Sequence, residues 1–501
     1  MEHWAKRKER GKDEQIAGGR CLDFQSAIRN PQFAIMSGMD LKDKKVLVVG
    51  LARTGAATVR FLAQRGARVK GSELKAAEDL KGPLEALRGL SVDWEFGGHT
   101  LPFFLDAELI VVSPGVPLSL PLLKKATEAG IPVISEIELA FRFLRRPVIA
   151  ITGTNGKTTT TTLIGEMLRA SGQQAFVGGN IGNPLIQFVA GAQEEKWAVV
   201  EVSSYQLEGI EKFRPSVAVL LNITEDHLDR YPSFQAYGKA KGRVFANQGK
   251  EDYAVLNADD ALTFSFAHRV KSQVLLFSRE RPVPVGCFLD RGGILFQAAE
   301  GQRERYGLDR VRVRGAHNLE NLMAAIAASR VCGCPPNALQ KVVEEFEGLE
   351  HRLEWVRDIE GVQFFNDSKG TNVGAVVKSL MSFQEPIWLI AGGRDKEGDY
   401  GPLNDLISKK VKGMALIGEA QKRMFEALGN RTETVRADSL EEAVEWAWAR
   451  AKPGEVVLLS PACSSFDMFE NYQERGRRFK EIVRGLKKRP LPGTEKKGRP
   501  L

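Results

Sequence analysis

A glycine-rich turn between a strand-like run and a helix-like segment constrains the fold of this chain more than any other feature. The run at 148–151 is short and apolar, and residues from about 158 to 170 have a helical pattern. The turn between them contains Gly153, Thr154, Asn155, Gly156, Lys157, Thr158 and Thr159. Glycines let backbone N–H groups turn towards an anion, and a helix N-terminus adds partial positive charge. We therefore predict a strand–turn–helix unit that binds phosphate.

The side chains of this turn indicate a nucleoside triphosphate. Lys157 is suited to reach the β- and γ-phosphates, and the Thr158 hydroxyl is suited to bind Mg²⁺. The spacing Gly-x-x-Gly-Lys-Thr is two residues shorter than the usual phosphate-loop pattern. The alternative is a glycine-rich turn with a surface lysine. The strand before the turn and the helix after it favour the phosphate site.

Short apolar runs alternate with helix-like segments along most of the chain. Such runs occur at 45–49, 109–112, 197–200, 217–221, 387–391 and 456–460. This alternation predicts α/β domains with parallel sheets. At about 150 residues per domain, 501 residues suggest three domains in series. We place them at 41–140, 141–348 and 349–486, between an N-terminal extension at 1–40 and a basic tail at 487–501.

The composition is that of an ordinary globular protein, with 43% hydrophobic and 27% charged residues. No apolar run approaches the roughly 18 residues that a membrane span needs. The polar N-terminus has no secretory signal pattern, so we expect a cytoplasmic protein. The five cysteines form no Cys-x-x-Cys pair, and we expect reduced, mostly buried thiols rather than a zinc site or a disulfide framework.

The net charge of +8 is concentrated at one end of the sequence. Residues 476–501 contain ten Lys or Arg and two Glu, so the rest of the chain is neutral overall. A basic face on a folded domain would indicate a nucleic-acid partner, whereas a basic tail with Pro and Gly is more typical of a solvated end. We therefore expect no nucleic-acid function.

Two acidic positions follow strand-like runs of the central region. Glu201 comes directly after the run at 197–200, and the segment 222–229, which contains His227, follows the run at 217–221. Ligands of parallel α/β sheets bind at the carboxyl ends of the strands, so these side chains would point towards the glycine-rich turn. Oxygen ligands suit a hard cation such as Mg²⁺. The alternative is that the acids only cap helices, and their placement after strands favours the metal site.

The first domain carries a second glycine-containing turn. Residues 50–55 read Gly-Leu-Ala-Arg-Thr-Gly, a dinucleotide fingerprint whose middle glycine is replaced by Ala52. Where an acid would bind the ribose of NAD, the chain reads Gly71-Ser72-Glu73, which weakens that hypothesis. A single nucleotide diphosphate on the helix N-terminus fits better.

From about Leu41 to Leu486 the chain resembles the Mur ligases, the ATP-dependent amide-forming enzymes of peptidoglycan precursor synthesis, and among them the members that add D-glutamate. The motif at 153–158 is common to the superfamily. Four further motifs are more particular to the D-glutamate-adding members, and they lie at 203–207 (Ser-Ser-Tyr-Gln-Leu), 366–372 (Asn-Asp-Ser-Lys-Gly-Thr-Asn), 392–396 (Gly-Gly-Arg-Asp-Lys) and 460–467 (Ser-Pro-Ala-Cys-Ser-Ser-Phe-Asp).

The resemblance implies three domains: a Rossmann-like UDP-binding domain, a P-loop-type ATPase domain with a parallel-rich sheet, and a C-terminal Rossmann-like domain that binds the amino acid. It implies UDP-N-acetylmuramoyl-L-alanine and D-glutamate as substrates, ATP and Mg²⁺ as cofactors, and a monomer. The expected UDP-substrate residues are Arg53, Thr54, Ser72 and Asn180. The turn at 153–159 would bind ATP together with Asn318, Arg352 and Asp367. The expected D-glutamate residues are Thr371, Lys396, Ser465, Phe466 and Tyr472.

The resemblance also implies the residues that take part in catalysis, which are Lys157, Glu201, His227 and Lys241. Thr158, Glu201, His227 and Lys241 would hold the metal. Lys241 matches a lysine that carries a carbamate in this family, which turns a cation into an anionic oxygen ligand. Without the resemblance, Lys241 would be interpreted as a surface lysine of a helix.

Some features depart from the family pattern or leave alternatives open. Gly71 and Gly370 are smaller than expected, and residues 1–38 have no counterpart, which favours translation from Met36 or Met39. A folylpolyglutamate synthase would share the phosphate turn but should lack the domain at 41–140. A nucleotide-binding protein without enzyme activity is supported only by the basic tail.

Overall fold

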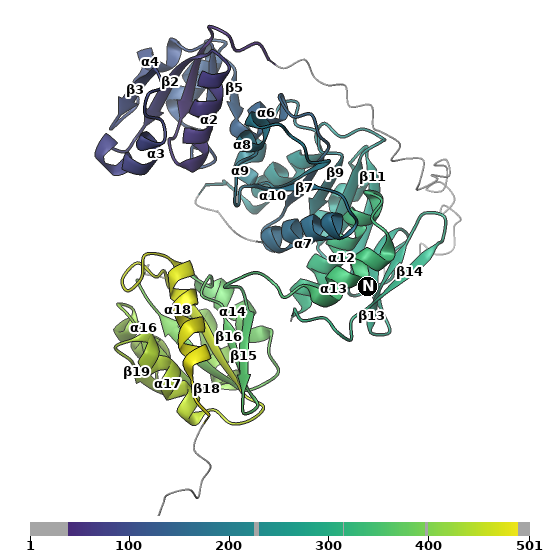
Figure 1. Cartoon of the computed structure of the whole chain (residues 1–501), viewed down its shortest axis with the longest axis vertical. Helices are drawn as coiled ribbons and strands as arrows, with labels where there is room; N and C mark the ends of the chain where they lie inside the picture. The colour runs from purple at the N-terminus through teal and green to yellow at the C-terminus, as the bar shows by residue number, and fades with distance from the viewer. Residues whose placement is uncertain (1–38, 225–229, 314, 396–398, 489–501) are drawn as a thin grey trace, which may run out of the picture. The chain divides into compact units, whose positions relative to one another are not determined.

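The computed structural model describes residues 39–224, 230–313, 315–395 and 399–488 (Figure 1). The chain separates into two compact units, one made by residues up to 310 with 319–344, and the other by 311–318 and the residues from 345 onward. In the described residues, the first unit contains two sheets and the second unit one. The α/β class predicted from the alternation of strands and helices is confirmed.

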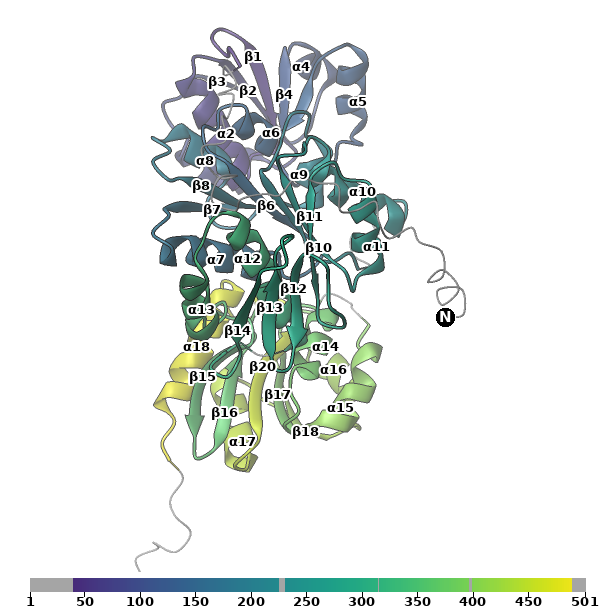
Figure 2. The same ribbon diagram turned by 90° about the vertical axis from the view of Figure 1, so that its right-hand side faces the viewer.

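The first sheet is parallel throughout and has the order β3-β2-β1-β4-β5. Its strands are β1 (Lys45–Val49), β2 (Arg68–Glu73), β3 (Val92–Phe96), β4 (Leu109–Val112) and β5 (Val133–Ser135). Side chains alternate along β1, so Val46 and Val48 pack with α2 (Arg53–Gln64) on one face. Leu47 and Val49 pack on the other face with residues of α4 (Leu101–Leu105) and α5 (Pro121–Glu128) (Figure 2).

The second sheet has the order β14-β13-β12-β11-β10-β9-β6-β8-β7, with neighbours parallel from β7 to β12 and antiparallel from β12 to β14. Its strands are β6 (Val148–Thr152), β7 (Ala175–Gly179), β8 (Trp197–Glu201), β9 (Val217–Leu220), β10 (Tyr253–Asn257), β11 (Gln273–Ser278), β12 (Gly286–Asp290), β13 (Gly293–Gln297) and β14 (Arg303–Gly307). The predicted parallel-rich sheet is therefore present, and the antiparallel hairpins at its edge are an addition that the strand–helix alternation did not predict.

Helices cover this sheet and connect it to the first. They are α6 (Glu136–Phe141), α7 (Lys157–Ala170), α8 (Leu185–Ala190), α9 (Ser204–Glu208), α10 (Phe234–Gly242), α11 (Ala261–Phe264), α12 (Ala316–Val331) and α13 (Pro336–Glu345), while α3 (Lys81–Glu85) belongs to the first domain. The apolar side chains of the first and second domains share one core, which extends through Ile137 of α6 to Leu185 of α8. The two domains of this unit are thus packed together.

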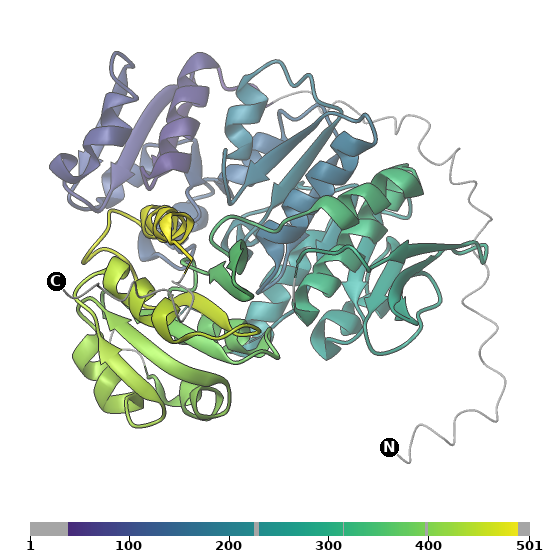
Figure 3. The same cartoon turned by 60° about the horizontal axis from the view of Figure 1, so that its bottom comes forward.

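The third sheet has the order β15-β16-β20-β17-β18-β19, with only the pair β15–β16 antiparallel among the described strands. Its strands are β15 (Glu354–Ile359), β16 (Val362–Asn366), β17 (Ile387–Gly392), β18 (Val411–Ile417), β19 (Glu433–Arg436) and β20 (Val456–Ala462). Leu389 lies in the core on the face of α14 (Val373–Met381), α15 (Asn404–Lys410) and α16 (Gln421–Leu428). Ile390 lies in the core of the opposite face, with α17 (Leu440–Arg450) and α18 (Tyr472–Gly485) (Figure 3).

The interpretation of the basic end of the sequence needs a correction. Four of the ten basic residues of 476–501 belong to α18 rather than to a solvated tail. Arg478 pairs with Glu441 at 2.6 Å, and the buried ammonium group of Lys480 pairs with Glu354 at 2.8 Å. The charge of these residues is therefore part of the packed surface of the third domain. The tail proper at 489–501 and the extension at 1–38 lie outside the described residues.

Two further expectations concern the cysteines and the membrane. Cys287, Cys332, Cys334 and Cys463 are free and buried, as predicted, and Cys21 lies outside the described residues. None of the helices in the described part of the chain is both long and apolar enough to span a membrane.

Candidate functional site

The glycine-rich turn joins β6 to α7 in a conformation that only glycine adopts easily. Gly153 has φ +148° and Gly156 has φ +85°. A Cβ atom on Gly156 would lie 2.2 Å from Oδ1 of Asn321, so there is also no room for a side chain there. The N-cap residue of α7 is Gly156, which has no side chain to cap the helix. The predicted strand–turn–helix unit is present, with a helix N-terminus suited to an anion.

Asn222 and Asn321 hold the turn in place. Asn222 belongs to the segment 222–229 that was predicted to lie towards the turn, whereas Asn321 was not predicted. The N–H of Asn155 donates to Oδ1 of Asn222 at 2.9 Å, and the N–H of Thr154 donates to the Asn222 carbonyl at 2.9 Å. On the other side, the Thr160 hydroxyl donates to Oδ1 of Asn321 at 3.2 Å. The strand end before Asn222 was the signal for that residue, whereas Asn321 lies within a helix far from the turn in the sequence and gave no such signal.

Two lysine ammonium groups converge on one carbonyl of the turn. Nζ of Lys157 donates to the Gly153 carbonyl at 3.0 Å, and Nζ of Lys241 donates to the same oxygen at 2.7 Å. Lys241 is only 2% exposed and lies over the ring of Tyr237, 4.5 Å from its centroid. The interpretation of Lys241 as a surface lysine, which the sequence gives without the resemblance, is therefore wrong. The turn combines a helix N-terminus with two cations, which suits a polyphosphate.

Glu201 lies at the end of β8 and connects two other predicted residues. Its carboxylate is 2% exposed and accepts from Nδ2 of Asn180 at 2.9 Å and from the Thr158 hydroxyl at 2.8 Å. Two neighbouring oxygen ligands of an octahedral Mg²⁺ site with bonds of 2.0–2.1 Å lie about 2.9 Å apart. The spacing and the oxygen chemistry of Thr158 and Glu201 therefore fit this ion. His227, the third predicted ligand, lies outside the described residues.

The first-domain turn brings Arg53 to the boundary with the second domain. A Cβ atom on Gly55 would lie 1.9 Å from the Gly50 carbonyl, so glycine is required for α2 to begin this close to β1. The exposed guanidinium of Arg53 donates to Oδ1 of Asn183 at 2.8 Å. The N–H of Leu51 donates to the carboxylate of Glu73 at 2.8 Å, and Thr54 lies partly buried in the first turn of α2.

Ser72, which was predicted to bind the UDP substrate, lies on β2 in contact with two other polar side chains. Its side chain is fully buried, and its hydroxyl contacts Oε2 of Glu95 at 3.0 Å and Nδ1 of His99 at 2.6 Å. Burial lowers the pKa of His99, against the opposing effect of the nearby Glu95. The hydroxyl of Ser72 thus helps to hold the end of β3 and the residues that follow it in place. The expected role of Ser72 in binding the UDP substrate stays a prediction. The small residue at the neighbouring position 71 has a steric explanation. A Cβ atom on Gly71 would lie 2.2 Å from the ring of Trp94.

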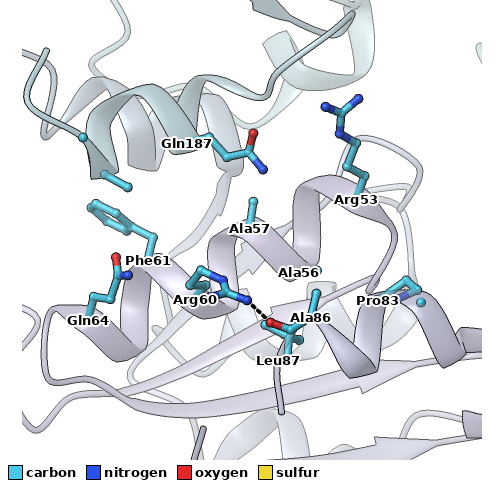
Figure 4. A pocket seen from close by; sticks show the side chains of 13 residues that line it. Arg53, Ala56, Ala57, Arg60, Phe61, Gln64, Pro83, Ala86, Leu87 and Gln187 are labelled. Carbon is cyan, nitrogen blue, oxygen red and sulfur yellow. Dashed lines mark hydrogen bonds between the residues drawn. The ribbon is translucent and has the colours of Figure 1, made fainter. Parts of the chain in front are cut away.

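A hollow of about 650 Å³ runs along α2 beside Arg53 (Figure 4). Its walls are mainly apolar, with Phe61 and Ala57 on α2, Pro83 on α3 and Gln187 on α8. The guanidinium of Arg60 donates to the Ala86 carbonyl across one end (Figure 4). The lining does not include the glycine-rich turn of the second domain, so this hollow is separate from the predicted phosphate site.

In the third domain, Asp367 is enclosed by hydroxyl groups. It is 6% exposed and accepts from the Ser379 hydroxyl at 2.6 Å and from the Ser460 hydroxyl at 2.7 Å. Burial raises the pKa of Asp367 to about 6. A Cβ atom on Gly370 would lie 2.6 Å from Oδ2 of Asp367, which explains the small residue at that position. These contacts join the loop after β16 to Ser379 of α14 and Ser460 of β20. The expected role of Asp367 in binding ATP stays a prediction.

The described D-glutamate candidates lie on the loops after β16 and β20 and at the start of α18. Thr371 is partly buried, Ser465 is 2% exposed, and the ring of Phe466 is 64% exposed. Tyr472 opens α18, with Nζ of Lys369 lying 5.3 Å from its ring centroid. Lys396 lies outside the described residues.

The remaining ATP candidates belong to the second unit, with Asn318 at the end of its segment 311–318 and Arg352 soon after position 345, where its second segment begins. The Arg352 N–H donates to the Leu349 carbonyl at 3.1 Å, and the Asn318 N–H donates to the Gly315 carbonyl at 3.0 Å. The side chain of each is partly buried. Their assignment to ATP stays a prediction.

Comparison with protein families gives matches over most of the chain. Residues 44–135 match the Mur ligase MurD-like N-terminal domain, residues 151–329 the Mur ligase middle domain, and residues 351–463 the Mur ligase glutamate ligase domain. The matches lie in the order of the three sheets.

Curated relatives match over nearly their whole length. The chain is 53% identical over 448 residues to the UDP-N-acetylmuramoylalanine--D-glutamate ligase of Geotalea daltonii, an alignment that covers 89% of this chain and 99% of the relative. It is 47% identical over 451 residues to the ligase of the same name from Syntrophus aciditrophicus, with 89% and 99% covered.

Solved structures give a likeness in fold. MurC, the UDP-N-acetylmuramate-alanine ligase of Thermotoga maritima, matches with a TM-score of 0.53 at 20% identity, covering 88% of this chain and 99% of that one. MurF from Acinetobacter baumannii matches with a TM-score of 0.56 at 17% identity, covering 87% and 93%.

Proposed function

The chain belongs to the Mur ligase family, and we propose that it joins D-glutamate to UDP-N-acetylmuramoyl-L-alanine while converting ATP to ADP and phosphate. The observation that carries this proposal is the identity of 53% over 89% of the chain to a ligase named for that reaction. The match of residues 44–135 to a MurD-like N-terminal domain argues against a folylpolyglutamate synthase. The proposed domains are those predicted from the sequence, at 41–140, 141–348 and 349–486.

The reaction must make a carboxylate electrophilic before an amine can attack it. Transfer of the γ-phosphoryl group of ATP to the carboxylate of the L-alanyl substrate gives an acyl phosphate. The amine of D-glutamate then attacks the acyl carbon, and the tetrahedral intermediate loses phosphate to leave an amide. Two anions must meet in the first step, so neutralisation of charge is the main task of the protein.

The glycine-rich turn is suited to this task. Lys157 reaches the Gly153 carbonyl, so its positive charge lies close to the N-terminus of α7, where the phosphates of ATP would bind. We propose that Lys157 moves from the loop carbonyls to the β- and γ-phosphates when ATP binds. Its ammonium group would then stabilise the charge that is transferred.

Thr158, Glu201 and His227 are the residues that would hold Mg²⁺, which would supply further neutralisation of the phosphate charge. We propose that Nζ of Lys241, after losing a proton to solvent, adds to the carbon of carbon dioxide and releases a second proton. The resulting carbamate would replace the positive charge of the lysine by an anionic oxygen donor. The support is the burial of Lys241 beside the turn together with the family resemblance. The expected role of Glu201 is strengthened by its contact with Thr158 at 2.8 Å.

The remaining substrates would bind at the ends of strands in the other two domains. Arg53, Thr54, Ser72 and Asn180 would hold the UDP-sugar substrate. Thr371, Lys396, Ser465, Phe466 and Tyr472 would receive D-glutamate, with Asn318, Arg352 and Asp367 assigned to ATP. One chain supplies every one of these residues, so we propose that it acts as a monomer. The need for ATP is consistent with the cytoplasm as its location.

Phosphate release from ATP tests this proposal. With the purified full-length chain, we expect release only when UDP-N-acetylmuramoyl-L-alanine and D-glutamate are both present. In a panel of amino acids, D-glutamate should be accepted, and L-glutamate, L-lysine and meso-diaminopimelate should be rejected. Turnover with L-lysine or diaminopimelate comparable to that with D-glutamate would contradict the substrate assignment.

A further inference from the structure

Arg475 is a buried arginine that no part of the proposed reaction uses. It lies on α18 and is 1% exposed, one of the largest fully buried side chains among the described residues. Burying a guanidinium is costly unless its donors are satisfied. Such a residue therefore needs an explanation in the fold or in the function.

The guanidinium joins the ends of two strands. Nε donates to the Ser368 hydroxyl at 3.0 Å, and Nη2 donates to the Ser368 carbonyl at 2.9 Å, in the loop after β16. Nη2 also donates to the Cys463 carbonyl at 3.2 Å, and Nη1 donates to the Ser464 carbonyl at 3.3 Å, in the loop after β20. Ser368 and Ser464 are nearly 100 positions apart in the sequence, so Arg475 ties together loops that have no local connection.

The loop after β17 is attached to the same cluster. The Arg394 N–H donates to the Ser464 carbonyl at 2.9 Å, the oxygen that also accepts from Arg475. A Cβ atom on Gly393 would lie 2.2 Å from that carbonyl and 3.0 Å from Nη1 of Arg475. The glycine therefore allows three strand-end loops to meet around one guanidinium.

These loops carry the residues assigned above to the amino acid. Thr371 follows Ser368 by three positions, and Ser465 directly follows Ser464. We propose that Arg475 is a positioning residue for the amino-acid substrate, which fixes the loops after β16 and β20 in the arrangement that receives a dicarboxylate. This inference rests on the proposed function, since that function assigns Thr371 and Ser465 to D-glutamate.

The charge of Arg475 adds to its geometric role. None of the hydrogen bonds described for Arg475 goes to a carboxylate, because its acceptors are three carbonyls and a hydroxyl. Burial lowers the pKa of Arg475 to about 10, so the group keeps its charge at neutral pH. Asp467 and Asp367 are the acids that act on it electrostatically. The charged guanidinium therefore keeps all the donors that its hydrogen bonds to the two loops need.

Lysine could not replace this arrangement. A planar guanidinium directs donors to several acceptors at once, whereas an ammonium group is a single point. The variant Arg475→Lys therefore keeps the charge and loses most of the connections between the loops. We expect it to raise the KM for D-glutamate at least tenfold, with the KM for ATP changed less than twofold.

Two control variants on the same helix separate positioning from general stability. Arg478→Lys makes the same substitution at an exposed position that pairs with Glu441 and Glu481. Val483→Ala opens a cavity in the core of α18 away from the loops. Both should leave the KM for D-glutamate unchanged, although Val483→Ala should lower the Tm.

Hydrogen exchange of the wild type and the variants, measured without substrates, gives a second readout. The amides of 367–372 and 463–466 should exchange at least tenfold faster in Arg475→Lys and at the wild-type rate in the controls. If Arg475→Lys does not fold, Ser368→Ala removes one acceptor and should change both readouts in the same direction by a smaller factor.

The outcomes distinguish this inference from the proposed function. If the wild type uses D-glutamate and Arg475→Lys lowers only the Tm, with KM and exchange as in Val483→Ala, the inference is overturned and the function stands. If the wild type does not use D-glutamate, the proposed function fails, and with it the substrate of this inference. Faster amide exchange in both loops of Arg475→Lys, together with a raised KM for D-glutamate, supports the inference.

Discussion

The glycine-rich turn after β6 and the strand-end loops of the third sheet both lie where α/β sheets bind ligands, but they are built differently. The turn takes its glycines, its lysine and its hydroxyl from one continuous segment, 153–158. The third-domain cluster draws on loops after β16, β17 and β20, held by Arg475. The turn can be recognised from one segment and its chemistry, whereas the third-domain residues were predicted only through the family resemblance.

The difference also predicts how each region responds to mutation. In the turn, the same few residues shape the backbone and supply the groups that would bind the phosphates. A single substitution there should therefore remove activity. In the third domain, positioning and contact with the substrate are divided among several residues. We therefore expect graded effects there, mainly on the KM for the amino acid.

The largest effect is expected for Lys157→Ala. Loss of the ammonium group that would stabilise the transferred charge should lower kcat about a thousandfold or more. Steady-state phosphate release at saturating substrates measures this, and the thermal unfolding curve should stay close to that of the wild type. Retention of more than a tenth of the wild-type kcat would show that the turn is not the centre of the reaction.

Lys241→Ala should lower kcat about a hundredfold, as expected for loss of a group that supports a metal site. Short carboxylic acids such as acetate should restore part of the activity, because they supply the oxygen donor of the proposed carbamate. Rescue by methylamine instead of acetate would indicate that the lysine acts as an unmodified cation. Mass spectrometry of the intact protein provides an independent check of the modification.

Lys396→Ala tests the third-domain site directly. A lost charged hydrogen bond costs roughly 1.5–3 kcal/mol, which corresponds to about 10- to 150-fold in the KM for D-glutamate. The KM for ATP should change little. Equal increases in the KM for D-glutamate and the KM for ATP would contradict a separate amino-acid site. Lys396 would then contribute to the binding of both substrates.

A smaller effect is expected for the buried carboxyl group of Glu136 in the first unit, which should make the free energy of unfolding depend on pH. Burial raises the pKa of Glu136 from its ordinary value of 4.5 to about 7, and its Oε1 accepts from the Ile186 N–H at 3.0 Å. The folded state therefore keeps a proton that the unfolded state releases between pH 4.5 and 7. This group makes the free energy of unfolding fall as the pH rises through that window, by about 3 kcal/mol at roughly 1.4 kcal/mol per unit.

Glu136→Gln removes this titration. Between pH 5 and pH 8, the free energy of unfolding of the variant should fall by about 2–3 kcal/mol less than that of the wild type. Urea titrations of both proteins at the two pH values measure the difference. An identical pH dependence in the two proteins would mean that Glu136 is ionised in the folded state.

The smallest effect is expected for removal of the residues after Leu486. The helix α18 ends at Gly485, so its ion pairs and Arg475 are retained. Turnover should stay within about tenfold of the full-length chain, a difference of about 1.4 kcal/mol in the barrier. A greater loss at unchanged folding would assign a role to the basic end.

The sequence by itself determined the α/β class, the three domains and the phosphate turn. These features depend on local patterns, because the alternation of apolar runs and helices sets the class, and adjacent residues form the turn at 153–158. The family could also be recognised from short motifs in a fixed order. Each of these signals can be seen within a few tens of residues.

Only the tertiary structure decided which side chains meet. Lys241 looks like a surface residue in the sequence, yet it is buried against Gly153, 88 positions away. The hydroxyl of Ser72 contacts Glu95 and His99, which lie 23 and 27 positions further along the chain. The sequence did not indicate a role for Arg475, because its hydrogen-bond partners lie on loops that only the strand order brings together. Burial and long-range hydrogen bonds depend on packing between distant segments, and no local pattern records that packing.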